Sequence, residues 1–247
     1  DAGAAGFTDD GIPLMDEKLL VQAMEQAKAL GLPLAFHEED PALMSEPGVH
    51  KGKVAEQIGY GGAARAAEDV MVARDCMLAL HTGASACIQH ISSKNSVELV
   101  RLAKMLGADV HAEATPHHFT LTDADIKEAN SNYKMNPPLR TKEDLEALRQ
   151  GLKDDVFDVI STDHAPHALT EKQESFKKAP FGIVGLETSV ALTITELVDT
   201  EVITPMQMAE KMSYNPAKIL HLDKKGSLAS GMDADVVVID PEAEYVI

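Results

Sequence analysis

Four apolar runs in the sequence end in residues that commonly bind metal ions. The four are AAGFTDD (residues 4–10), which ends in Asp9 and Asp10; LPLAFH (32–37), in His37; ACIQH (86–90), in His90; and FDVISTD (157–163), in Asp163. Imidazole is a neutral donor and carboxylate offsets the charge of a cation, so two of each suit Zn²⁺ or a similar ion. A carboxylate at such a site can also accept a proton from water whose pKa the metal has lowered to about 7.

Each of these residues also has an ordinary structural explanation. A single histidine at a strand end is more often a hydrogen-bonded structural residue. Asp10 or Asp163 alone could cap a helix or sit in a turn. The joint pattern favours a metal site, because each of the four runs ends in a residue type that binds metals, at the carboxyl end of a predicted strand. Isolated buried acids and imidazoles would carry a desolvation cost without a partner.

The elements that position these residues follow from the hydrophobic pattern. Short apolar runs alternate with amphipathic ones, which predicts strands at 32–37, 86–91, 109–115, 157–162 and 234–240 and helices at 16–30, 63–80, 95–106, 141–153, 186–199 and 205–221. Expected boundary signals are Gly31 after the first helix, a capping box of Asn95 and Glu98, Thr141 as an N-cap, and Thr204-Pro205. Strands that alternate with helices imply βαβ units and a parallel sheet. The carboxyl ends of such strands line one functional face.

The expected fold class is α/β, with about four βα units, or half of a (β/α)8 TIM-type barrel. No GxGxxG or GxxxxGK[ST] motif occurs, which disfavours the phosphate-loop folds. The closing GSLASGMDADVVVID has a Gly-rich turn and a β-rich run. We therefore expect barrel over residues 1–225 and the start of a small β domain over 226–247.

Composition limits the partners. A net charge of -18 repels nucleic-acid backbones and anionic membranes. No apolar run approaches the ~20 residues of a membrane span. Cys76 and Cys87 lack CxxC spacing, and we expect two reduced thiols in a cytoplasmic protein.

Three further stretches leave alternatives open. The pair His117-His118 follows Pro116, and a supporting or structural role is as plausible as a ligand role. Asn136 in NPPLR could hold a substrate amide or carboxylate, although the pattern alone favours a turn. The stretch APFGIVGLET (179–188) is either a loop that closes over something or a plain connection.

Several of these motifs together resemble a known family. They are FTDDG (7–11), FHEE (36–39), QHISS (89–93), EATPHHF (113–119), MNPPLR (135–140), STDHAPH (161–167) and APFGIVGLET (179–188). In this order and spacing they look like the bacterial type I dihydroorotases of the amidohydrolase superfamily. The resemblance covers nearly the whole chain. It implies a (β/α)8 barrel with a small β domain, and reversible zinc-dependent cyclisation of N-carbamoyl-L-aspartate to L-dihydroorotate in pyrimidine synthesis.

The resemblance also implies roles for single residues. Asp10 stands where the family has its metal-bridging carboxylate, a position at which related amidohydrolases often use a carboxylated lysine. His37 and His90 match two histidines on the second zinc of a binuclear site. Asp163 matches the metal ligand that also shuttles the proton. The matching substrate-binding positions are Asn136, His167, Phe181 and Gly182.

The sequence departs from the family at one point that matters. The H-x-H-x-R motif of the first barrel strand, which supplies two ligands and an arginine, does not occur in the 247 residues. We therefore expect part of a longer protein, inactive alone. Alternatives are a hydantoinase- or allantoinase-like amidohydrolase and a non-catalytic partner of aspartate transcarbamoylase. A homodimer, or a complex with that enzyme, is also an expectation.

Overall fold

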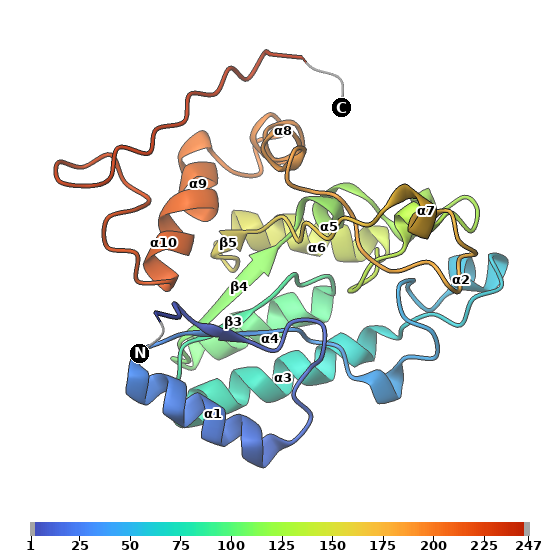
Figure 1. The fold of residues 1–247 in the computed structure, drawn as a ribbon, viewed down its shortest axis with the longest axis horizontal. Helices are drawn as coiled ribbons and strands as arrows, with labels where there is room; N and C mark the ends of the chain where they lie inside the picture. Colours follow the sequence, from blue (N-terminus) through green and yellow to red (C-terminus); the bar gives the residue numbers. More distant parts are fainter. Residues whose placement is uncertain (1–2, 245–247) are drawn as a thin grey trace.

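The computed structural model describes residues 3–244, and a parallel sheet forms its centre (Figure 1). Within that range the sheet has five strands in the order β1-β2-β3-β4-β5. Their bounds are Phe7–Thr8, Leu34–Phe36, Ala86–Ile88, Val110–Ala114 and Val159–Ile160. Each strand pairs in parallel with the next one along the chain. The predicted parallel α/β fold is therefore confirmed, and the strand order is that of part of a barrel.

Four long helices connect the strands along the outer side of the sheet. They are α1 (Glu17–Leu30), α3 (Arg65–Thr82), α4 (Lys94–Met105) and α6 (Lys142–Lys153). In Figure 1 the helices α1, α3 and α4 lie side by side below the strands. Short helices fill the connections: α2 (Lys53–Gln57), α5 (Pro116–Thr120), α7 (Leu169–Lys172), α8 (Ser189–Thr193), α9 (Pro205–Ala209) and α10 (Asn215–Ile219), with 3-10 turns at Pro41–Leu43, Asp123–Asp125 and Ser131–Tyr133. None of the helices described is long and apolar enough to cross a membrane.

Most of the predicted helix boundaries are confirmed. Gly31 ends α1 in the left-handed conformation, Thr141 forms a capping box with Asp144, and Thr204 caps α9. The predicted capping box of Asn95 and Glu98 is wrong. Ser93 caps α4 instead, and its hydroxyl accepts from the Asn95 amide. Helix capping depends on which residue leaves the helical conformation, and the strand–helix turn places that change two residues earlier.

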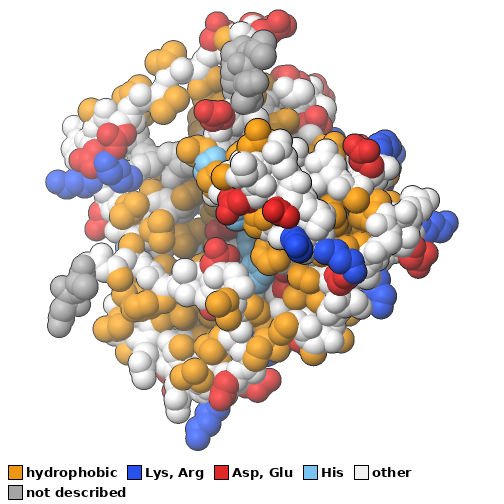
Figure 2. Space-filling model, turned by 45° about the vertical axis from the view of Figure 1, so that its right-hand side comes forward, with side chains coloured by type: hydrophobic (Ala, Val, Ile, Leu, Met, Phe, Trp, Pro, Cys, Tyr) orange, Lys and Arg blue, Asp and Glu red, His pale blue; other side chains and the backbone are white. Residues whose placement is uncertain are grey.

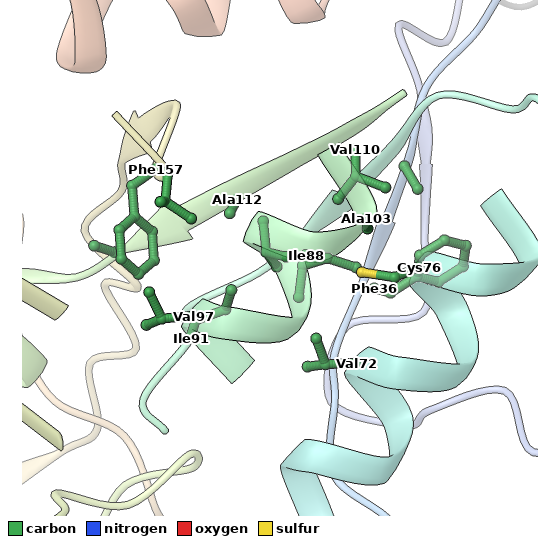
Figure 3. Packing of buried hydrophobic residues seen from close by; sticks show 14 of the residues in the cluster. Phe36, Val72, Cys76, Ile88, Ile91, Val97, Ala103, Val110, Ala112 and Phe157 are labelled. Carbon is green, nitrogen blue, oxygen red and sulfur yellow. The ribbon is translucent and has the colours of Figure 1, made fainter. Parts of the chain in front are cut away.

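The core is mostly aliphatic, with a few phenylalanines, and it lies between the sheet and the outer helices (Figure 3). Phe36 and Ile88 from the strands pack with Val72 and Cys76 of α3, all at most 2% exposed. At the other end Phe157 approaches α6 at Gly151, where an added Cβ would lie 2.8 Å from the Phe157 ring. The sheet and helices are thus packed closely enough to hold the strand ends in place.

The C-terminal elements differ from the expectation. The helix expected at 186–199 begins at Ser189 and turns into a π-helix at Ile194–Val198, and the one expected at 205–221 contains a π-helix at Glu210–Tyr214. The strand expected at 234–240 does not form among the described residues. Val236, Val237 and Val238 are 62–91% exposed. A strand needs a neighbour for its backbone groups, and no described segment pairs with this run. Residues 245–247 of the expected β domain lie outside the described residues.

Candidate metal centre and active site

Asp10, His37 and His90 converge at the carboxyl ends of β1, β2 and β3, as predicted. Nδ1 of His37 lies 3.0 Å from Nε2 of His90. Each of these nitrogens is 3.6 Å from Oδ1 of Asp10. Both imidazoles are buried, whereas the Asp10 side chain is 55% exposed. Figure 2 shows histidine and acidic side chains together at the bottom of the central hollow.

The spacing of these three donor atoms fits a divalent metal ion. Ligand atoms about 2.0–2.2 Å from a tetrahedral zinc ion lie about 3.3–3.6 Å from one another. The observed separations are 3.0, 3.6 and 3.6 Å. These residues also form a group of potential ligands whose atoms all lie within 4.8 Å of one another. Two of the separations fall in this range and the one between the two histidines is shorter, so two nitrogens and one carboxylate oxygen form a donor set suited to a divalent metal ion.

Backbone geometry directs these side chains to the centre. The Asp9 carboxylate accepts hydrogen bonds from the amides of His37 and Leu14, which ties the end of β1 to the end of β2. His90 and Asp163 both adopt left-handed backbone conformations, with φ of 34° and 46°. Non-glycine residues rarely adopt this region, and it recurs at functional sites. Asp9, the neighbour of Asp10 in the sequence, thus has a supporting role.

The centre attracts positive charge. Hydrogen bonds from His37 and His90 hold the pKa of Asp10 far below its usual range, so this carboxylate stays ionised. Burial opposes the charged form of His37, but hydrogen bonds with Asp10 and Glu39 raise its pKa to about 9. These contacts favour an ionised Asp10 and a protonated His37, and a metal ion would compete with that proton.

Asp163 lies near this group but not within it. Its Oδ2 is 3.9 Å from Nε2 of the buried His117, and the side chain is 26% exposed. Burial raises the pKa of Asp163, and the charge of Asp10 adds to the shift. A carboxyl group with a raised pKa accepts a proton more readily than a free aspartate. Its metal-ligand role stays a prediction.

The predicted substrate residues lie in two groups on separate segments of the chain. His167 contacts the loop directly, with Nε2 3.1 Å from the carbonyl oxygen of Phe181. Gly182 has φ of 141°, and a Cβ there would lie 2.6 Å from the Ala165 carbonyl, so the loop requires glycine. Asn136 lies on a separate segment, and its buried Oδ1 has no hydrogen-bond partner among the described residues.

Sequence reasoning assigned no role to four residues that support the site. Glu39 lies 3.2 Å from Nε2 of His37 and is 1% exposed. Thr115 contacts both His117 and His118, and His118 bonds to the carbonyl of Pro137, which links the region of Asp163 to the segment of Asn136. A glutamate two residues after a candidate ligand histidine was the available signal for Glu39.

His164 also gains a role from the structure. Its Nδ1 accepts from the amides of Gly185 and Leu186 and so anchors the far end of the loop. The contact joins residues 21 and 22 positions apart. Sequence spacing carried no sign of it.

Comparison with known proteins places these observations in a family. Residues 1–246 match the model described as "Amidohydrolase family". A curated protein of Clostridioides difficile (strain 630) named "Dihydroorotase" is 57% identical over 246 residues, and one of the same name from Clostridium acetobutylicum is 48% identical over 247. Both alignments cover all of this chain and 58% of the relative. The chain thus spans less than two thirds of the curated relatives it matches.

Solved structures share the fold. The L-hydantoinase (dihydropyrimidinase) from Arthrobacter aurescens superposes with a TM-score of 0.83 at 25% identity, over 95% of this chain and 55% of that one. The D-hydantoinase (dihydropyrimidinase) from Thermus sp. superposes with a TM-score of 0.77 at 26% sequence identity. This alignment covers 93% of this chain and 52% of that one. Three observations point to the same family. They are the strand order, the group of potential metal ligands at the strand ends and the match to the family model. The chain belongs to the amidohydrolase family and contains part of its barrel.

Proposed function

We propose that the complete protein is a dihydroorotase, which interconverts N-carbamoyl-L-aspartate and L-dihydroorotate in pyrimidine biosynthesis with zinc as its metal. The observation that carries this proposal is the cluster of Asp10, His37 and His90 at the strand ends, with Asp163 beside it. Curated relatives with the matching name, at 46–57% identity, support the choice of substrate.

In this proposal the site residues have three roles: metal binding, proton transfer and substrate binding. Asp10, His37 and His90 would hold a divalent ion, with Asp163 as a further ligand in a binuclear centre. When bound, zinc would polarise the ring amide carbonyl and make a nearby water more acidic. Asp163 would take the proton from that water and pass it to the departing ring nitrogen. Asn136, His167 and the backbone of Phe181 and Gly182 would bind the pyrimidine ring.

Metal content and substrate turnover, measured on the full-length protein, separate this proposal from its alternatives. The full-length protein should bind about two zinc ions per chain and cyclise N-carbamoyl-L-aspartate. Turnover of hydantoins in preference to dihydroorotate would instead support a hydantoinase, the activity that names the solved structures of similar fold. Absence of bound metal after reconstitution would favour a non-catalytic partner of aspartate transcarbamoylase.

A substitution tests the proton-transfer role. Asp163→Asn removes the acceptor at nearly constant size, so cyclisation should be lost while the protein stays folded. Substantial remaining turnover would contradict the role of Asp163. Thermal melting gives the control for folding.

The remaining parts of the proposal concern the whole protein. Residues 1–225 would belong to the catalytic barrel and 226–247 to the start of a small β domain. A homodimer or a complex with aspartate transcarbamoylase is proposed as the assembly. Cys76 and Cys87 are buried and unpaired, which supports a reducing, cytoplasmic location.

A further inference from the structure

A buried lysine lies between the two groups of substrate-binding residues. Lys134 is 3% exposed, and it stands two positions before Asn136. Its ammonium group forms no ion pair among the residues that the structure describes. Burying an ammonium is costly unless hydrogen bonds replace its water. The surroundings of Lys134 should therefore show what compensates this cost.

The compensation comes from one short stretch of the loop. Nζ of Lys134 donates to the carbonyl oxygens of Phe176 and Ala179, both at 2.8 Å, and lies 3.4 Å from that of Lys177. All three ammonium protons can thus point to acceptors within four consecutive residues. The rings of Tyr60, Phe176 and Phe181 surround the same nitrogen, with centroids 5.5–6.0 Å away. Movement of this stretch would leave a buried charge without partners.

The backbone of Lys134 holds the loop a second time. Its carbonyl oxygen accepts a hydrogen bond of 2.9 Å from the amide of Gly182. A second lysine strengthens the connection, because Nζ of Lys172 donates to the carbonyls of Ser131 and Pro180 and lies 3.4 Å from that of Lys134. The turn at Ser131–Tyr133, next to Lys134, and the loop at 172–182 are therefore joined on both sides of Phe181 (α7 marks this region in Figure 1).

We propose that Lys134 is a positioning residue that fixes the Phe181–Gly182 loop beside Asn136, so that the loop is preformed rather than a lid that closes on substrate. The inference deepens the proposed function and rests on it for the identity of the substrate. The restraint itself rests only on the contacts above. Lys134 would set the spacing between Asn136 on its own segment and the backbone of Gly182 on the loop, without touching the substrate.

Hydrogen–deuterium exchange of the full-length protein tests the restraint without any activity. In the wild type, the amides of residues 176–186 should exchange slowly before substrate is added. Lys134→Met keeps the aliphatic stem and removes the ammonium, and it should speed exchange across 176–186 by 10-fold or more. Unchanged exchange there would overturn the proposal, as would a wild-type loop that gains protection only when substrate binds.

Lys211→Met is the matched control. Lys211 is also buried, at 1% exposure, and its Nζ also donates to a backbone carbonyl, that of Phe157. Its loss should speed exchange near Phe157 and leave 176–186 unchanged. If Lys134→Met loosens the whole protein, Lys172→Met decides the question. That lysine is half-buried, and its loss should still loosen 176–186 selectively, whereas an unchanged loop would count against the proposal.

Steady-state kinetics separate this inference from the proposed function. Lys134→Met should raise KM for dihydroorotate about 10-fold or more and change kcat much less, with metal content unchanged. A fall in kcat at constant KM would contradict a positioning role. Loop protection that depends on Lys134 in a protein without dihydroorotase activity would refute the proposed function and leave the restraint standing.

Discussion

The two clustered histidines differ in how the protein holds the ring nitrogen that faces away from the centre. Glu39 contacts Nε2 of His37, which favours the proton on that nitrogen, and in the proposed metal site this leaves Nδ1 for the ion. Nδ1 of His90 is buried and has no hydrogen-bond partner among the described residues. Glu39 therefore orients His37, whereas no described residue holds Nδ1 of His90.

Glu39→Ala should weaken zinc binding about 10- to 100-fold, the range typical when a partner of a metal-binding histidine is removed. Competition with a chelator measures this affinity. Asp40→Ala is the control, because Asp40 accepts from the amide of Ala42 and makes no contact with His37. Equal zinc affinity in the two variants would refute the role of Glu39.

At the scale of elements, a buried network fixes the segment that carries Asn136. Arg140 is 3% exposed, and its guanidinium donates to Glu68 of α3 and to the hydroxyl of Ser92. The Glu68 carboxylate also accepts from the amides of Ser92 and Ser93. The outer helix, the turn after β3 and the NPPLR segment are thus joined by one ion pair, which places Asn136 relative to His90.

Arg140→Met should destabilise the protein by about 3–5 kcal/mol, because it leaves the Glu68 carboxylate buried without its partner. Arg101→Met is the matched control. Arg101 pairs with Asp154 at the surface, and exposed pairs contribute about 0–1 kcal/mol. Urea unfolding of both variants measures the difference. Similar losses in the two would show that the buried pair adds no special stability.

Helix α6 packs closely against Phe157 at Gly151. A Cβ at Gly151 would lie 2.8 Å from both the Phe157 ring and a methyl of Val97. Gly151→Ala should therefore destabilise the protein by about 1–3 kcal/mol, although alanine favours helices. The double variant with Val97→Ala should recover part of the loss. A stabilised Gly151→Ala in thermal melting would contradict this packing.

At the scale of the whole molecule, buried neutral histidines set a pH dependence. Burial and the neighbouring charge of Arg140 lower the pKa of His50 to about 4. Burial likewise lowers the pKa of His118 to about 3. Histidines in the unfolded chain bind protons below pH about 6.5. Between that pH and the folded-state values the unfolded chain holds more protons, so this contribution to stability is lost as pH falls.

His50→Gln should reduce this pH dependence, since glutamine can accept from Arg140 without titrating. The melting temperature of the wild type should fall from pH 7.5 to 5.5 more steeply than that of the variant. The carboxylates are present in both proteins, so the difference between the two slopes reports the loss of His50 and of its interactions with Asp144 and Glu68. Parallel slopes would contradict the assignment.

Much of the fold followed from local patterns in the sequence. The hydrophobic periodicity of residues 16–30 and the turn residues Gly31, Thr141 and Thr204 act over a few positions, and the structure confirms these boundaries. The run at 234–240 shows where local pattern is insufficient. A β-rich composition does not form a strand without a neighbouring strand to pair with its backbone.

The residue types of the candidate metal centre followed from the sequence, because acids and histidines that end apolar runs lie at the carboxyl ends of parallel strands. The tertiary structure decided which residues support them. Glu39, His164, Arg140 and Lys134 act through contacts with atoms that folding brings near. Three of these contacts join positions 21 to 72 residues apart, at distances of a few ångströms that only the packed sheet, helices and loops define.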